Sequence, residues 1–320
     1  RSASDTDLTN RAYYAAESGV EDAKRAIRSV LGGSSLDLRG DDCSPPDSSQ
    51  YSNILSDQSG FDVEYTCQLI DLTPSSYKAE FDGANQSVQL PLSAVDADDN
   101  PANFNRLTIK WHINAESGAG GDGLDPELRT VTDQTLTDVN TWNGNDWPAM
   151  LRANIFWYNE NQNITRNRID QYTVFLNPTR SGSGDGGNVN SGIWDGQIID
   201  ANCDPNANSG QYVCEASFNG FSNSNQFYLR LGSLYRGAQF EVELSQGNNE
   251  RSLAGAQALI DVTGRAADVF RRVETTVDLS DFNILPNFVI TSSDDICKDF
   301  GVADNASNFT GIANTSCSQP

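Results

Sequence analysis

The first thirty residues of the chain carry a hydrophobic pattern with the period of an α-helix. Apolar residues recur every three or four positions from Leu8 to Val30, without an intervening proline, and form a narrow stripe. Many positions on this stripe hold Ala or Gly, which permit close approach of a neighbouring backbone. The pattern predicts a long amphipathic helix over residues 1–31. From periodicity alone, the simplest arrangement is a helix that lies on the chain's own sheet.

Residues of the capping type predict where this helix begins and ends. Thr6 and Asp7 both belong to the class that caps helix N-termini. Gly32 and Gly33 tolerate positive φ and therefore end a helix readily. We expect the first cap at Thr6 or Asp7 and the end of the helix at the two glycines.

Beyond the helix, apolar and polar residues alternate with the period of a β-strand. In the clearest case, residues 105–113, Ile109 and Trp111 point to one side, while Lys110 and His112 point to the other. This predicts a sheet with one solvent-facing side, on which His112 lies. Strands are predicted at residues 61–70, 77–81, 87–92, 105–113, 150–158, 171–176, 211–218, 227–231, 238–244, 256–262 and 270–279.

Short connections rich in Gly, Pro and Ser favour antiparallel hairpins over βαβ units. The last two strands are expected to join through a turn that begins at Thr263 and Gly264. The fold class predicted is α+β, with the amphipathic helix packed on a large antiparallel β head. We divide the chain into the helix (1–31), a β-rich head (32–280) and a polar C-terminal tail (281–320).

Composition indicates a folded, strongly acidic protein. The chain has 320 residues, of which 37% are hydrophobic, enough for a substantial core. It carries 21 basic and 44 acidic residues, for a net charge of −23. Such a surface repels phosphate backbones, so direct binding of nucleic acid is not expected.

The cysteines indicate an oxidising compartment. Six are present, none in the paired C-x-x-C spacing of metal sites, which favours three disulfides in an extracytoplasmic protein. Six cysteines allow about 15 connectivities. We favour the sequential one, in which each disulfide closes a short loop: Cys43 with Cys67, Cys203 with Cys214, and Cys297 with Cys317.

Sequence motifs for catalysis are weak. Residues 118–123 and 182–187 match G-x-G-x-x-G, but neither opens a predicted helix, so nucleotide binding is not expected. The only histidine, His112, excludes a multi-histidine zinc site, and no G-x-S-x-G motif is present. We expect no enzyme. A hydrolase that uses a carboxylate pair is the weakest alternative, because 44 acidic residues offer many pairs.

Calcium is the one cofactor for which candidate ligands exist, although none is required. Oxygen-bearing side chains occupy every second position at Asp200, Asn202, Asp204 and Asn206, in the rhythm of a calcium loop. The EF-hand turn glycine is replaced by Pro205. A second acidic group comprises Asp96, Asp98, Asp99 and Asn100. Simple solvated loops are the alternative for both segments.

Sequons and loop tryptophans are the remaining surface candidates. N-x-S/T sequons begin at Asn85, Asn163, Asn305, Asn308 and Asn314; in an Asn-rich chain most are expected by chance, and glycosylation needs a host with the machinery. Three tryptophans in loop-like segments either stack on a sugar or partner protein or anchor their loops on the head: Trp142, Trp147 and Trp194.

Two segments carry a resemblance to a known family. Residues 12–23, AYYAAESGVEDA, resemble the type IV pilin helix just beyond its membrane-embedded half, and residues 258–279 resemble the closing strands of large minor pilins. The resemblance implies a helix that packs with other pilin subunits in a filament core and a head displayed outside. Its packing positions are Tyr13, Tyr14, Ala16, Gly19, Val20 and Ala23.

The family pattern also includes a leader and a hydrophobic half-helix, which this sequence does not show before Arg1. The resemblance implies that the full-length form is membrane-anchored before assembly and then extracellular, in a surface pilus. We expect a minor pilin that contributes to assembly and adhesion, with a host-surface or glycan ligand. The alternative is a secreted adhesin or carbohydrate-binding module outside any pilus.

Overall fold

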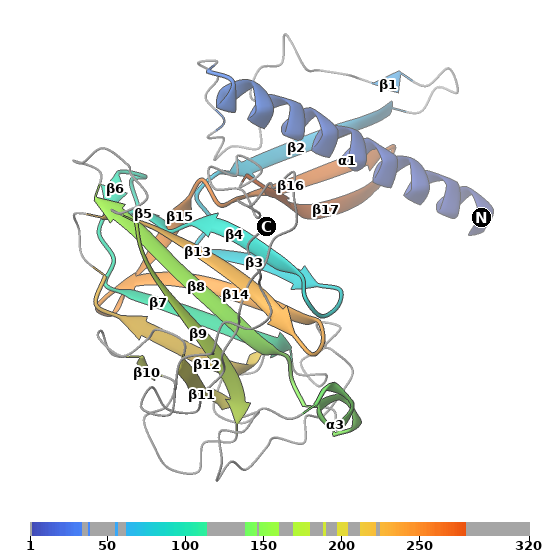
Figure 1. The fold of residues 1–320 in the computed structure, drawn as a ribbon. Coiled ribbons are helices and arrows are strands. Elements are labelled where there is room, and N and C mark those ends of the chain that lie inside the picture. Colours follow the sequence, from blue (N-terminus) through green and yellow to red (C-terminus); the bar gives the residue numbers. More distant parts are fainter. Residues whose placement is uncertain are drawn as a thin grey trace, which may run out of the picture. The chain divides into compact units, whose positions relative to one another are not determined.

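The computed structural model describes residues 2–33, 38, 55–56, 62–113, 138–145, 147–159, 169–179, 188–189, 197–203, 212–221 and 225–279. This part of the chain is α+β, as predicted, with an N-terminal helix and a large, mainly antiparallel sheet (Figure 1). The predicted tail, 281–320, and the sequons at Asn163, Asn305, Asn308 and Asn314 lie outside the described residues.

The helices are α1 (Ser2–Leu31) and α3 (Val139–Gly144). The strands in the first half of the chain are β1 (Leu55–Ser56), β2 (Asp62–Asp71), β3 (Ser76–Phe81), β4 (Ser87–Pro91), β5 (Ser93–Val95), β6 (Pro101–Ala102), β7 (Arg106–Ile113) and β8 (Met150–Asn159). The remaining strands are β9 (Asp170–Thr179), β10 (Asn188–Val189), β11 (Gln197–Cys203), β12 (Tyr212–Asn219), β13 (Asn225–Leu234), β14 (Ala238–Gln246), β15 (Asn249–Ala254), β16 (Gln257–Ala266) and β17 (Val269–Asp278).

The predicted limits of α1 are half right. The helix already includes Thr6 and Asp7, so neither residue is its N-cap. Its end is confirmed, because Gly33 adopts a left-handed backbone with φ 94° and the chain leaves the helix after Leu31.

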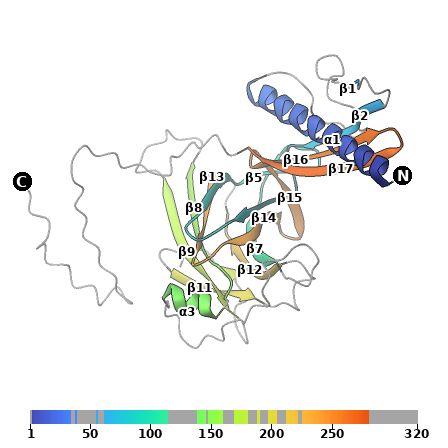
Figure 2. The same cartoon turned by 90° about the vertical axis from the view of Figure 1, so that its right-hand side faces the viewer.

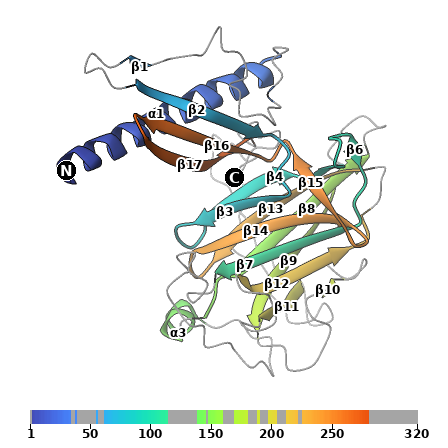
Figure 3. The same cartoon turned by 180° about the vertical axis from the view of Figure 1, so that it is seen from behind.

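A small, four-stranded sheet carries α1. Its strand order is β1-β2-β16-β17, and α1 lies across one face of it (Figures 1 and 3). Ala16, Ala23 and Ile27 of the helix share one buried cluster with Ile260 and Val262 of β16. The prediction from periodicity, a helix on the chain's own sheet, is confirmed.

The predicted turn at Thr263 and Gly264 is wrong. Strand β16 continues to Ala266, and the hairpin turns at Ala267, whose φ is 55°. The pairing of β16 with β2 shifts register between Thr263 and Gly264. An ideal β-carbon on Gly264 would collide with the carbonyl oxygen of Ala12 in α1. This glycine therefore serves close contact between strand and helix and not a turn.

The large, 13-stranded sheet is inserted between two strands of the small sheet. It begins with β3 and ends with β15, whereas the small sheet takes β2 from before this segment and β16 and β17 from after it. The predicted head, 32–280, is thus two sheets, one of which belongs with α1 (Figures 1 and 2). Local alternation does not reveal this division, because it depends on pairing between distant strands.

The strands of the large sheet share one hydrophobic core. It joins inward-facing residues of two groups of strands, β4-β13-β8-β9 and β12-β7-β14-β3, and includes Trp111, Leu151 and Leu229. On the outward side of β7, Lys110 donates to Glu243 at 2.6 Å, as the predicted alternation requires. Two strand pairs are parallel, β9 with β11 and β10 with β12, which the sequence did not predict.

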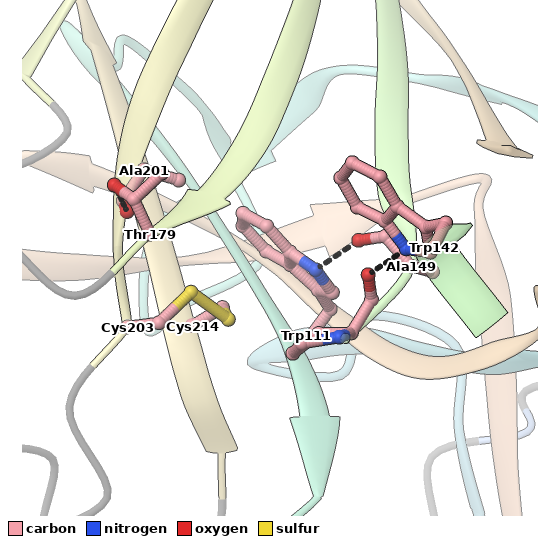
Figure 4. The surroundings of a disulfide bond; sticks show 8 residues. Trp111, Trp142, Ala149, Thr179, Ala201, Cys203 and Cys214 are labelled. Carbon is pink, nitrogen blue, oxygen red and sulfur yellow. Dashed lines mark hydrogen bonds between the residues drawn. A yellow bond between two sulfur atoms is a disulfide. The ribbon is translucent and has the colours of Figure 1, made fainter. Parts of the chain in front are cut away.

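The disulfide between Cys203 and Cys214 is confirmed (Figure 4). These cysteines are direct partners in the pairing of β11 with β12, and both are fully buried. Cys67 is also disulfide-bonded. Cys43, Cys297 and Cys317 lie outside the described residues.

Candidate functional site

The docking of α1 decides which of its residues another protein could reach. Ala16, Gly19, Val20 and Ala23, which the pilin resemblance implies are in filament packing, are buried against the chain's own small sheet. In this fold the four residues therefore contact the chain's own sheet and are not exposed for contact with another subunit. The small side chains allow the helix backbone to approach the sheet closely.

Gly19 shows how tight this approach is. An ideal β-carbon there would lie 2.6 Å from Cγ1 of Val262 and 2.9 Å from Cγ of Tyr65. Its carbonyl oxygen accepts a hydrogen bond of 2.6 Å from Nε2 of Gln68. The sheet thus contacts the helix backbone itself at this position.

Tyr13 and Tyr14, the other two predicted positions, are exposed on α1. Their exposed fractions are 44% and 61%, and their rings meet edge to face with centroids 6.0 Å apart. A hydrogen bond to Glu17 raises the pKa of Tyr13. Of the six implied packing positions, these two are the ones that another protein can contact.

A buried carboxylate fixes α1 on the small sheet. Asp22 is 4% exposed, accepts a hydrogen bond of 3.1 Å from the Tyr65 hydroxyl and pairs with Arg25 at 2.7 Å. Burial, followed by the charge of Asp22, raises the pKa of Tyr65 to about 12. The phenol therefore stays protonated as a donor well above its ordinary range.

Removing this phenol is expected to change both stability and its dependence on pH. Tyr65→Phe should lower the free energy of unfolding by about 1 kcal/mol at pH 7, because Asp22 loses a donor. The folded-state pKa lies above the unfolded value, so the wild type has its full stabilisation below about pH 10 and loses it as the pH rises toward 12. Urea unfolding at several pH values should show a smaller alkaline loss in the variant.

The control for this prediction is Tyr14→Phe, which removes an exposed phenol from α1, the helix that Tyr65 contacts through Asp22. It should unfold as the wild type does at neutral pH. Identical alkaline profiles for Tyr65→Phe and the wild type would contradict the role given to Tyr65.

Two of the four calcium candidates at 200–206 lie among the described residues. Asp200 and Asn202 lie in strand β11, not in the loop predicted for them, and Oδ1 of Asp200 accepts from Nδ2 of Asn177 at 2.9 Å. Asp204 and Asn206 lie outside the described residues. Within the described ranges, no group of three or more His, Cys, Asp or Glu residues could hold a metal ion.

The second acidic segment forms a tight turn between β5 and β6. Oδ1 of Asp96 accepts hydrogen bonds of 3.0 Å from the backbone amides of Asp98 and Asn100. These bonds lower the pKa of Asp96, with the one to Asn100 having the larger effect. Asp99 has φ 58° and accepts from the Thr73 hydroxyl at 2.6 Å. The carboxylates of Asp96 and Asp99 thus hold the turn by hydrogen bonds, as a solvated-loop interpretation predicts.

His112 is not on the solvent-facing side of its strand. It is 1% exposed, and its backbone is left-handed, with φ 63°. This conformation interrupts the alternation on which the prediction relied. A buried position at the end of β7 gives the only histidine no access to solvent.

The loop tryptophans act as anchors where the structure describes them. Trp142 in α3 is fully buried, stacks on Tyr235 with centroids 4.2 Å apart and donates from Nε1 to the Pro148 carbonyl at 3.0 Å. Trp147 meets it edge to face at 5.2 Å. In Figure 4, the Trp142 indole lies beside that of Trp111, and each donates a hydrogen bond to the backbone before β8. Trp194 lies outside the described residues.

A pocket of about 260 Å³ opens where β4 and β13 meet the β5–β6 hairpin. Its lining combines amides and a hydroxyl with aromatic rings of the cluster around Phe227, which contacts Phe221 at 5.0 Å. The lining residues are Leu92, Ser93, Ala94, Pro101, Ala102, Asn103, Phe104, Asn225, Gln226 and Phe227. None of these side chains ionises, so the pocket offers binding groups without a general acid or base.

Sequence patterns did not single out Arg152 and Arg230, which the structure places together. Each occupies an outward position in a strand whose alternation was recognised, at 150–158 and 227–231. The missing information was the pairing of β8 with β13, which brings the two arginines onto neighbouring strands.

Other candidate segments remain outside this description. Both glycine-rich motifs, 118–123 and 182–187, fall among residues that the structure does not describe. No helix in the described part of the chain has the length and apolar character needed to span a membrane.

Comparison with known proteins returned no match. No family model fits the chain, and neither a curated protein nor a solved structure is significantly similar to it.

Proposed function

We propose that this chain is a structural subunit of a type IV pilus-like surface filament, of the minor-pilin kind, that displays the large sheet. The observation that carries this proposal is the topology: α1 docks on a small sheet built from strands on both sides of the large-sheet segment. A unit of this kind holds both ends of an inserted domain. The unit of α1 and the small sheet therefore suits a subunit that is attached to a filament through its helix and displays the large sheet as a separate domain.

The exposed tyrosines supply the contact through which α1 would meet neighbouring subunits. Tyrosine buries a large, amphipathic surface at little cost in side-chain entropy, and exposed aromatic residues are typical anchors of protein interfaces. The rest of the outward side of α1 carries charge pairs such as Arg11 with Asp7 at 2.9 Å. Apart from Leu31 at the end of the helix, the tyrosine pair therefore supplies the large exposed apolar surface of α1.

Filament incorporation should depend on this pair. In cells that make the full-length protein, replacing Tyr13 and Tyr14 together by serine should reduce the amount in sheared filaments at least about 10-fold, the effect of losing an interface hot spot. The purified chain should keep its stability within about 0.5 kcal/mol, because both residues are exposed. Quantitative immunoblots of sheared filaments measure the first result, and urea unfolding measures the second.

The matched control is Val139→Ser, an exposed apolar residue on α3, which should leave incorporation unchanged. Immunogold labelling with antibody to the large sheet should mark filaments of wild-type cells. Label confined to the envelope or the medium would contradict the proposal, as would normal incorporation of the double variant.

That contrary result would favour the second candidate, a secreted adhesin or carbohydrate-binding module. The specific observation behind it is the pocket beside Phe104 and Phe227, where amides adjoin aromatic rings. Such pockets suit uncharged sugars, whose hydroxyls bind amides and whose C–H faces pack on rings.

A further inference from the structure

Two arginines lie on neighbouring strands of the large sheet, on the side away from its core. In the pairing of β8 with β13, Arg152 is opposite Gly232 and Arg230 is opposite Asn154, so the arginines are diagonal neighbours. A β-carbon on Gly232 would lie 3.6 Å from Nη2 of Arg152. The guanidinium of Arg152 thus occupies space that a larger residue at position 232 would restrict.

Neither guanidinium is neutralised by the described part of the chain. Arg230 donates from Nη2 to the amide oxygen of Gln89 at 2.9 Å. The Nε atoms of Arg152 and Arg230 are buried and have no hydrogen-bond partner among the residues that the structure describes. Burial, followed by the charge of Arg152, lowers the pKa of Arg230. Holding these two charges together therefore costs stability.

In the other group of strands, lysines on the outward side are paired with glutamates. On the outward side of β3, β7 and β14, Lys110 pairs with Glu243 at 2.6 Å and Lys78 with Glu241 at 3.4 Å. Acidic residues outnumber basic ones by 44 to 21 in the chain, so carboxylates are plentiful. Two neighbouring arginines without a carboxylate partner among the described residues lower stability, and proteins keep such costly arrangements at functional sites.

The groups around the arginines suit a sugar. Asn154 donates to the Thr173 hydroxyl at 2.6 Å, which leaves its amide oxygen available as an acceptor. Phe156 and Tyr228 are buried, at 7% and 8% exposure, and stack with centroids 5.4 Å apart. The half-buried Tyr158 extends this stack at 6.2 Å from Tyr228, so it is the ring that a ligand can reach. Amides and hydroxyls beside aromatic surface recognise sugar hydroxyls and C–H faces.

The two guanidinium groups favour a ligand with negatively charged carboxylates. Arginine binds a carboxylate with two parallel hydrogen bonds, a geometry that lysine does not offer. A nucleic acid is disfavoured because the net charge of −23 repels a long polyanion. A saccharide with spaced carboxylates places a few charges at the arginines and neutral hydroxyls beside them.

We propose that this surface, the arginine face (Arg152, Asn154, Tyr158 and Arg230), binds an acidic saccharide through its carboxylate groups. The arginine face would give the displayed sheet a ligand and so deepens the proposed function. Its test uses the purified chain, so a negative result here leaves the filament experiment unaffected, and the reverse also holds.

The binding test compares tetragalacturonate with its methyl ester, which has the same sugar framework without the charge. Calorimetric titration of the whole chain should show binding of the acid and at least about 10-fold weaker binding of the ester, as loss of charge-assisted hydrogen bonds requires. Arg152→Gln together with Arg230→Gln should weaken binding of the acid at least 10-fold. Arg28→Gln, an exposed arginine on α1, should bind as the wild type does. Equal affinity for acid and ester, or unchanged binding by the double variant, would overturn the proposal.

Stability without ligand separates a binding role from a structural one. Because the double variant loses repulsion between two charges, its melting temperature should equal or exceed that of the wild type. A large decrease would identify the arginines as structural and overturn the proposal. A second variant, Arg152→Lys, keeps the positive charge and should still lose affinity for the acid, because an ammonium group cannot form two parallel hydrogen bonds with a carboxylate. Equal stabilisation by inorganic sulfate would reduce the site to a general anion site and also overturn the saccharide assignment.

Discussion

Replacing Gly264 with alanine is expected to lower the free energy of unfolding by about 3 kcal/mol, although it adds only a methyl group. The new β-carbon would collide with the Ala12 carbonyl oxygen and the Ala16 amide nitrogen, and it would lie 3.1 Å from the Ala15 carbonyl carbon. All three obstacles are helix backbone, which no change of rotamer can move aside. The helix must therefore shift away from β16 and lose contacts along its buried side.

The loss should be confined to the helix and the small sheet, whose buried clusters are distinct from the core of the large sheet. Urea unfolding followed by circular dichroism gives the overall change, and amide hydrogen exchange locates it. Protection should fall along α1 and β16 and remain in β13 and β14. Gly83→Ala, which meets no atom within 4 Å, is the matched control and should be nearly neutral. Equal stability of the two variants would contradict the contact inferred for Gly264.

Local periodicity accounts for the elements that could be predicted from the sequence. Residues 105–113 were predicted as a strand and form β7 (Arg106–Ile113), because alternation reflects which side of the strand meets the core. The helix end was predictable for an equally local reason, since Gly33 takes the left-handed backbone that favours glycine. Both features depend on neighbouring residues alone.

Two of the wrong predictions, those at Gly264 and His112, involve backbone that departs from its local pattern. Gly264 resembles a turn residue between two apolar runs, but its reason for being glycine is the approach of α1, more than 200 residues earlier in the chain. His112 follows the alternation of its strand in sequence, yet it is 1% exposed and its backbone is left-handed, with φ 63°. Neither the approach of the helix nor the left-handed backbone at His112 has a signal in nearby residues.

The candidate sites depended on strand pairing and so were less predictable still. The small-residue stripe of α1 fits a sheet of the same chain or another subunit equally well, and the structure assigns its Ala16 to the chain's own sheet. Arg152 and Arg230 become neighbours through the pairing of β8 with β13. The sequence alone does not reveal this pairing, so it shows only two arginines in separate predicted strands.

Replacing Trp142 with alanine is expected to have the largest effect on stability, a loss of about 4 kcal/mol. The indole is fully buried, one ring face stacks on Tyr235, and its edge meets Trp147, so alanine would leave a cavity between them. The Pro148 carbonyl would also lose the indole donor, which joins α3 to the residues before β8. The defect therefore combines lost packing with an unpaired acceptor.

Circular dichroism should follow this unfolding, since the substitution removes a fluorophore. Trp142→Phe keeps a ring to stack on Tyr235 and should cost about 2 kcal/mol, mainly from the missing indole donor and a smaller cavity. Val139→Ala changes an exposed residue of the same short helix, at 48% exposure, and should cost less than about 0.5 kcal/mol. A ligand-stacking role for Trp142 predicts the opposite pattern, in which alanine removes binding and leaves stability intact. The buried stack makes loss of stability the expected result, because the ring surface that a sugar would need is already covered by Tyr235.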